Sequence, residues 1–194
     1  MNKLIAIVGM SGSGKSVITE YLQKNNWAKL YFGGITYKLM EEAEIVRTED
    51  GKSEKEFREK LRKDYGKECL AKFLKPDIEK ELKTHNVVLD GLYSWQEYKY
   101  LIQHFPNLKL ICVVIDKKIR YSRVQTREDR PFNQAAIFYR DVTEIEDLDK
   151  GGPIAFADYY LLNNGNLDEY YKRLNEIIED INKEGEYKNE VHES

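Results

Sequence analysis

A glycine-rich octapeptide near the start of the chain constrains the fold more than any other stretch. Gly9 to Ser16 have the sequence Gly-Met-Ser-Gly-Ser-Gly-Lys-Ser, after the apolar run Leu4 to Val8 and before a helix-like segment, Val17 to Lys24. Between a buried strand and a helix, such a turn cradles phosphate oxygens with its backbone N–H groups. The helix dipole favours an anion at the same place. The alternative is an ordinary glycine-rich turn that happens to end in Lys-Ser. Such a turn would not need a strand before it and a helix after it, so the octapeptide predicts a nucleotide-binding P-loop.

The residue types of the loop each have a chemical reason. Gly9, Gly12 and Gly14 allow tight turns with no Cβ between the backbone and anionic oxygens. Lys15 supplies a mobile positive charge for the β- and γ-phosphates, and the Ser16 hydroxyl suits a Mg²⁺ ligand. We therefore expect ATP and Mg²⁺ as cofactors. The expected cofactor-binding residues of this stretch are Gly9, Ser11, Gly12, Ser13, Gly14, Lys15, Ser16 and Val17.

The composition argues against several classes of protein. The chain has 194 residues and a net charge of −3, which suits one domain and disfavours nucleic acid as the main partner. No stretch approaches the ~20 apolar residues of a membrane helix, and the first apolar run is too short for a signal peptide. Cys69 and Cys112 have no partners at metal-ligand spacing. We expect a cytoplasmic protein without a membrane partner or a disulfide framework.

Apolar runs alternate with helix-like segments along the chain. Besides Leu4 to Val8, the runs span residues 28–32, 87–90, 108–115 and 159–162. This alternation indicates an α/β fold with a five-stranded, mostly parallel sheet that helices cover on both faces. Ligands bind such sheets at the carboxyl ends of the strands. That rim is expected to carry the P-loop, Phe32-Gly33-Gly34, Asp90-Gly91, Asp116 and the turn Asn163-Asn164-Gly165.

The intervening segments have helical periodicity. Residues 34–50 predict a helix and a polar turn, and residues 54–84 predict two helices with a break near Gly66 or Pro76. Further helices are predicted over 95–104, 133–148 and 167–181, with a loop over 149–158. From Lys183 onward apolar residues are sparse, so we expect one domain over residues 1–182 and a frayed polar tail over 183–194.

Two aspartates end neighbouring apolar runs. Asp90 closes the run 87–90, where an acid in a P-loop protein either holds Mg²⁺ or accepts a proton from the attacking hydroxyl. A strand-end Asp-Gly turn is the alternative for Asp90. Asp116 follows the next run, and we expect it to be the N-cap of the helix after it. The late turn is expected to edge the adenine ring with Asn164 and Gly165.

A cluster of arginines follows Asp116. A spacing of three and four residues puts Arg120, Arg123 and Arg127 on one helix face. Exposed salt bridges would explain such a helix, but a kinase needs cations here to neutralise charge on a transferring phosphoryl group. We expect that catalytic role for Arg123, Arg127 and Arg130, at least one of which contacts the group. Arg140, in the next helix, is expected to face the same site.

Seven segments together resemble a known group of enzymes. They are GMSGSGKS, VRTEDG, LRKDYG, VVLDGLYSWQE, IRYSRVQTREDR, FYRDVTEIE and IAFADYYLLNNGNLDE. From about residue 4 to about residue 180, the chain resembles the dephospho-CoA-kinase-like, adenylate-kinase-related branch of P-loop nucleotide kinases. The late segment resembles dephospho-CoA kinases, and the middle is more similar to the archaeal adenylate-kinase-related proteins.

The resemblance implies a three-layer P-loop NTPase fold, a short lid over about residues 127–140 and an acceptor-binding helical region over about residues 34–84. Arg47, Arg62 and Tyr93 would line the acceptor site. The family often has an arginine where this chain has Tyr93, which removes one acceptor contact. The chain also lacks the cysteine cluster of a zinc-bound lid.

These features favour an ATP- and Mg²⁺-dependent phosphotransferase. Its acceptor would be a small nucleotide-type molecule, either a nucleoside monophosphate or dephospho-CoA. The alternative is a regulatory ATPase without a small acceptor. The arginine cluster argues against it, because such a protein does not require several lid arginines. A nucleic-acid end kinase shares the donor site but lacks support from the net charge. GTP is disfavoured because no Asn-Lys-x-Asp stands at a strand end.

Overall fold

The sheet has five strands, and all its pairings are parallel. The computed structural model describes residues 2–48, 52–126 and 133–192, with the backbone alone for 185–192. The strand order is β2-β3-β1-β4-β5, which confirms the predicted α/β sheet. The strands are β1 Leu4–Val8, β2 Ala28–Tyr31, β3 Val87–Asp90, β4 Lys109–Val114 and β5 Tyr159–Leu162.

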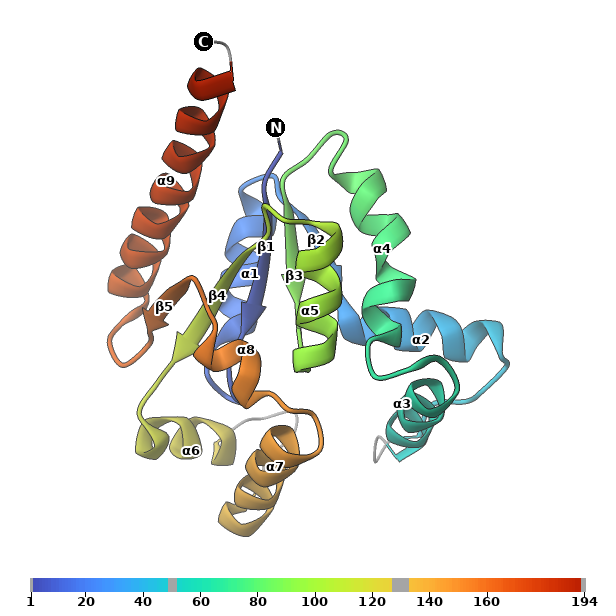
Figure 1. The fold of residues 1–194 in the computed structure, drawn as a ribbon. Coiled ribbons are helices and arrows are strands. Elements are labelled where there is room, and N and C mark those ends of the chain that lie inside the picture. The colour runs from blue at the N-terminus through green and yellow to red at the C-terminus, as the bar shows by residue number, and fades with distance from the viewer. Residues whose placement is uncertain (1, 49–51, 127–132, 193–194) are drawn as a thin grey trace.

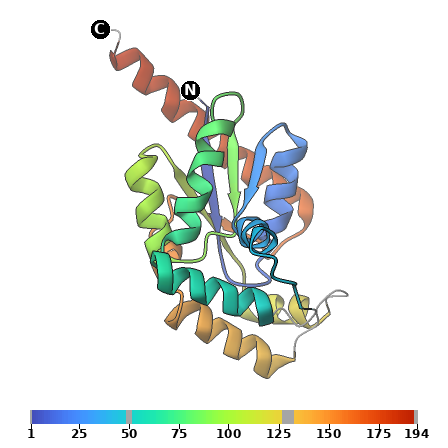
Figure 2. The same ribbon diagram turned by 90° about the vertical axis from the view of Figure 1, so that its right-hand side faces the viewer.

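Helices cover both faces of this sheet (Figure 1). They are α1 Lys15–Lys24, α2 Phe32–Glu42, α3 Lys52–Tyr65, α4 Cys69–Glu81, α5 Trp95–His104, α6 Lys117–Gln125, α7 Gln134–Glu146, α8 Gly151–Ala155 and α9 Leu167–His192. Figure 2 shows α4 and α5 on one side of the strands and α1 on the other. Among the described residues, no helix is long and apolar enough to cross a membrane.

The side chains of β1 divide the core into two layers. Ile5 and Ile7 pack with buried residues of α1 and α9, whereas Leu4, Ala6 and Val8 pack with those of α4 and α5. Successive side chains of a strand point to opposite faces, so a wholly apolar strand needs helices on both sides. The apolar run before the P-loop therefore becomes the centre of a three-layer domain.

Several boundaries differ from those that the sequence predicts. The break between α3 and α4 lies at Gly66, which has a φ of +94°. Pro76 lies inside α4, because Leu74 and Ile78 on either side of it are buried in the core and hold the helix together. The loop predicted over 149–158 contains the short helix α8, with Pro153 in its first turn, where proline is tolerated.

The structure also differs from the prediction of a frayed polar tail from residue 183. Helix α9 continues through this segment to His192. The segment is rich in Lys and Glu, which are good helix formers even without an apolar face. Amphipathic periodicity therefore marks only the part of α9 that packs on the sheet.

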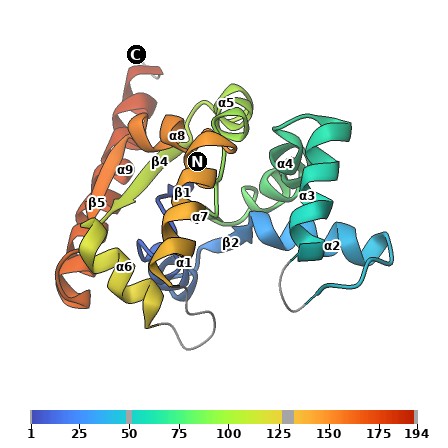
Figure 3. The ribbon, with the colours of Figure 1, turned by 90° about the horizontal axis from the view of Figure 1, so that it is seen from below.

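The parallel strands bring their carboxyl ends to one edge of the molecule. The P-loop after β1, Tyr31 at the end of β2, Asp90 at the end of β3 and Asn163 after β5 all lie along this edge. Figure 3 shows that α6 and α7 lie across the same end, with α3 beside them. Helices α6 and α7 therefore lie at the end of the sheet that carries the P-loop.

The core predicts that two valines contribute very differently to the free energy of unfolding. Val88 in β3 has no exposed surface, whereas Val46 after α2 is 83% exposed. Val88→Ala should lower the free energy of unfolding by about 2 kcal/mol, because it removes two buried methyl groups and leaves a cavity. Val46→Ala should change it by less than about 0.5 kcal/mol. Urea unfolding measures both, and equal costs would contradict this description of the core.

Candidate functional site

The P-loop has the backbone shape that its glycines predict. Gly12 and Gly14 have φ values of +84° and +96°, in the left-handed region that favours glycine. Asn163 Nδ2 donates to the Ser13 carbonyl at 2.8 Å, and the Tyr170 hydroxyl donates to the Gly14 carbonyl at 3.3 Å. These bonds fix two carbonyl oxygens of the loop. Helix α1 starts at Lys15 and directs its positive end at the loop.

Lys15 folds back over the loop. Its Nζ donates to the Gly9 carbonyl at 2.8 Å and to the Met10 carbonyl at 3.0 Å. Burial, together with the positive charge of Lys150, lowers the pKa of Lys15 to about 7, although Glu144 and Asp90 oppose the shift. The two carbonyls are neutral acceptors, so an anion at this place would be a better partner for the charged ammonium.

The loop residues fit a nucleotide with its metal. Ser13 Oγ is buried without a hydrogen-bond partner among the described residues, so it keeps an unused donor inside the loop. Ser16 is exposed in the first turn of α1. Within the described ranges, no three His, Cys, Asp or Glu side chains form a metal cage. A Mg²⁺ ion here would take several of its ligands from phosphate oxygens and water molecules, as is usual for this ion.

Asp90 lies beside the P-loop because β3 pairs with β1, with Asp90 opposite Ile7. Its Oδ2 accepts from the Thr19 hydroxyl at 3.1 Å and forms an ion pair with Lys29 Nζ at 3.2 Å. The sequence reasoning missed both partners. Thr19 lies one helical turn after Lys15, which is a signal that could have identified it, whereas Lys29 has no motif around it.

Arg120 connects the P-loop to α7. It is 6% exposed, and its guanidinium forms a bidentate pair with Asp141, with one contact at 2.8 Å, while Nη1 also donates to the Ser11 carbonyl at 3.0 Å. Tyr121 donates to the same carboxylate at 3.1 Å. The pattern that placed Arg120 on one helix face with Arg123 did not reveal this buried structural role.

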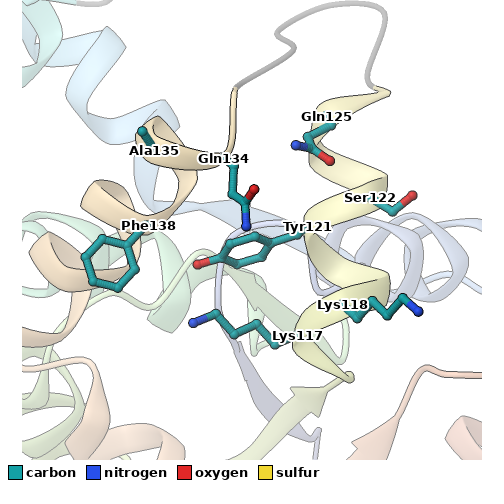
Figure 4. A pocket seen from close by; sticks show the side chains of 8 residues that line it. All are labelled: Lys117, Lys118, Tyr121, Ser122, Gln125, Gln134, Ala135 and Phe138. Carbon is teal, nitrogen blue, oxygen red and sulfur yellow. The ribbon is translucent and has the colours of Figure 1, made fainter.

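The predicted lid arginines are only partly described. Arg123 is half-buried in α6, and Arg127 and Arg130 lie outside the described residues. The predicted lid range 127–140 therefore overlaps the structure only in α7. Figure 4 shows Lys117 and Tyr121 pointing from α6 toward α7, where they line a groove with Phe138. Among the described residues that line this groove, none is a predicted site residue.

A buried ionic cluster lies between α7 and α8. Lys150 Nζ donates to Glu144 Oε2 at 2.7 Å, and Arg140 Nε donates to Glu144 Oε1 at 3.2 Å. Burial alone would raise the pKa of Glu144, but Lys150, with Arg140 and Lys15, lowers it below its usual range. The sequence prediction included Arg140 but missed the other two. Glu144 lies in the segment FYRDVTEIE without an assigned role, and Lys150 lies outside every quoted segment.

The expected acceptor-side residues are spread over several elements. Tyr93 lies under the Lys150 ammonium, 4.7 Å from Nζ to the ring centre. Arg47 forms an ion pair with Glu54 at 3.3 Å and stacks on Tyr37 at 4.0 Å, so it is bound to α2 and α3. Arg62 is half-buried in α3. Tyr93 therefore joins the cluster near Lys15, and Arg47 does not.

A hydrogen bond joins the segments that follow β4 and β5. The Asp116 backbone N–H donates to Asn164 Oδ1 at 2.9 Å. Asp116 occupies the N-cap position of α6, as predicted, but its side chain forms no capping bond. Asn163, which was interpreted only as part of the turn, holds the P-loop, while Gly165 is exposed.

The buried pair of Arg120 and Asp141 predicts a large cost when one partner is lost. Asp141→Ala should lower the free energy of unfolding by about 3–5 kcal/mol, because it leaves a buried guanidinium without its carboxylate. Asp147→Ala, at an exposed aspartate that follows α7, is the matched control. Urea unfolding compares them, and an equally small effect for both would show that the pair does not hold α6 to α7.

Comparison with known proteins identifies the domain. A family model described as an AAA domain matches residues 5–149. A UPF0200 protein of Methanococcus vannielii is 32% identical over 183 residues, covering 92% of this chain and 96% of the relative. A UPF0200 protein of Sulfurisphaera tokodaii is 29% identical over 181 residues, covering 92% and 97%.

Solved structures share the fold at low sequence identity. TT1252 from Thermus thermophilus has a TM-score of 0.64 at 16% identity, covering 92% of this chain and 97% of that one. Shikimate kinase from Bacteroides thetaiotaomicron has a TM-score of 0.58 at 12% identity, covering 91% and 98%. The fold is therefore that of P-loop NTPases, which P-loop kinases share. The chain belongs to the UPF0200 family and carries its P-loop in an AAA domain.

Proposed function

We propose that this protein is an ATP- and Mg²⁺-dependent phosphotransferase that acts on a small nucleotide-type acceptor, a nucleoside monophosphate or dephospho-CoA. The observation that carries the proposal is the charge of the cluster at the strand ends. Lys15, Lys29, Arg140 and Lys150 surround two carboxylates, Asp90 and Glu144. A gathering of cations at the strand ends suits the phosphates of ATP with one Mg²⁺ ion.

The donor side consists of the P-loop and α1. The backbone N–H groups of the loop and the Lys15 ammonium would bind the phosphates, and Ser16 would bind the metal. Lys15 would exchange its two carbonyl partners for phosphate oxygens. The turn of Asn164 and Gly165 would edge the adenine ring, because Asn163 holds that turn against the P-loop.

Asp90 would hold the metal through a bound water. Thr19 and Lys29 both contact Oδ2, which fixes the carboxylate and leaves Oδ1 without a protein partner among the described residues. The metal would withdraw charge from the phosphate oxygens during transfer. Of the two roles that the sequence allows for Asp90, this arrangement favours the metal-binding one.

The acceptor would lie between α3 and the loop after Asp90. Tyr93 comes from that loop, and the charge of Arg58 on α3 acts on both Tyr93 and Tyr31. Arg62 is one helical turn from Arg58, on the same face of α3. Two arginines on this face suit an acceptor that carries a phosphate, which supports a nucleotide-type molecule. Arg47 would add a contact only after leaving Glu54.

Transfer would need no covalent bond to the protein. The bond from the γ-phosphorus to the β–γ bridging oxygen breaks, its electron pair leaves with ADP, and an acceptor oxygen forms the new bond and loses its proton to water. Lys15 and the lid arginines Arg123, Arg127 and Arg130 would stabilise the charge of the group in transit. Closure of the lid would exclude water that could compete with the acceptor.

The first test is an acceptor-dependent transfer assay. Purified protein receives ATP and Mg²⁺ with each ribo- and deoxynucleoside monophosphate, with dephospho-CoA or with no acceptor, and ADP formation is measured. One of these acceptors should raise the rate, and Lys15→Met should lower it at least about 100-fold. Lys24→Met, at an exposed lysine on the last turn of α1, is the matched control. Turnover that no acceptor changes would contradict the transferase and favour a regulatory ATPase.

The second test concerns Asp90. Asp90→Asn should raise the Mg²⁺ concentration needed for half-maximal transfer by about tenfold or more, because an amide binds the metal-bound water more weakly than a carboxylate. Asp116→Asn changes an exposed aspartate after the neighbouring strand and should leave the requirement unchanged. If Asp90→Asn lowers kcat without any change in the Mg²⁺ requirement, the metal role is wrong.

A further inference from the structure

Lys150 is a buried cation for which the P-loop chemistry has no assigned use. Only 1% of its surface is exposed, and it stands at the N-cap of α8, outside every motif of the sequence. Burying an ammonium is costly unless partners replace the lost water. Its side-chain partners among the described residues are the Glu144 carboxylate at 2.7 Å and the Tyr93 ring at 4.7 Å.

These partners leave part of the Lys150 ammonium unused. An ammonium has three N–H donors, and one of them bonds to Glu144. Glu144 is shared with Arg140, so one buried carboxylate serves two cations. The other two N–H donors have no hydrogen-bond partner among the described residues, and a buried donor without a partner is costly. They therefore point to an anionic ligand beside Lys150.

The position of Lys150 indicates which anion. On one side its charge lowers the pKa of Lys15, so the two ammoniums interact across the P-loop. On the other side it lies over Tyr93, in the loop that follows Asp90. A cation between the donor side and the acceptor side is placed where the transferring group carries its charge.

We propose that Lys150 is a second phosphate-binding lysine of this site and donates hydrogen bonds to the non-bridging oxygens of the γ-phosphoryl group. This inference rests on the proposed function and adds a catalytic residue to it. Lys150 keeps its protons throughout, while the phosphorus–oxygen bonds change as described above. Glu144 is a positioning residue that holds the ammonium in the nucleotide-free protein and competes with phosphate for it.

The structural alternative predicts a different pattern of mutant effects. If the pair of Lys150 and Glu144 served stability alone, Lys150→Met and Glu144→Gln would each lower the stability of the fold. The double variant would then restore the stability that each single variant lost. If Lys150 binds phosphate, the two changes have opposite effects. Lys150→Met removes the ammonium, whereas Glu144→Gln removes its competitor and leaves the ammonium in place.

The experiment measures nucleotide affinity by calorimetry, with Mg²⁺ and either ADP or β,γ-imido-ATP, at one pH and salt concentration. Lys150→Met should weaken binding of the triphosphate analogue by about 10- to 100-fold and binding of ADP by less than about threefold. Glu144→Gln should bind the analogue at least as tightly as the unsubstituted protein. The double variant Glu144→Gln/Lys150→Met removes both buried charges, so it keeps the fold and should still show the loss.

The outcomes separate this inference from the proposed function. Equal losses for ADP and the analogue, no loss for either, or restoration in the double variant would overturn the role of Lys150. If the unsubstituted protein binds neither nucleotide, both proposals fall. If it binds nucleotide but no acceptor raises the rate, the transferase proposal falls, while the ratio of the two affinities still decides whether Lys150 binds the γ-phosphate.

Discussion

The parallel pairing of β1 with β3 is the constraint on which the site depends. Its register places Asp90 opposite Ile7, two residues before the P-loop begins. Both strands are apolar and buried, so a slip by one residue would turn their core side chains to the wrong layers. The hydrophobic core therefore fixes the distance between the phosphate loop and the acid. The packing of the core thus fixes the relative positions of the charged groups at the strand ends.

The electrostatics of the strand ends follow from that geometry. Because the sheet delivers Lys15 and Asp90 to one edge and α7 adds Arg140 and Glu144 there, charges from distant parts of the sequence meet in a buried place. Lys15 donates to neutral loop carbonyls, and Lys150 shares the Glu144 carboxylate with Arg140. A polyphosphate would give both ammoniums an anionic partner, which would couple ligand binding to stability.

Much of this arrangement is predictable from the sequence. The P-loop is local, since its glycines, its lysine and its flanking apolar run lie within about a dozen residues. The strands are mostly apolar runs, with Lys29 inside β2 as an exception. Lys150, Lys29 and Glu144 are not predictable in this way. They are common residue types in unremarkable surroundings, and only tertiary packing gives them partners. Asp116 lies at the predicted N-cap of α6, but its side chain makes no capping bond, and the local sequence does not reveal that its backbone N–H donates to Asn164.

The most direct measurement is a crystal structure of the protein with Mg²⁺ and β,γ-imido-ATP. The account predicts that the phosphates lie in the loop of Gly9 to Ser16, and that Lys15 leaves the Gly9 and Met10 carbonyls to contact them. It also predicts the metal between Ser16 and a water held by Asp90. A nucleotide bound away from this edge of the sheet, or one that leaves Lys15 on its two carbonyls, would contradict the account.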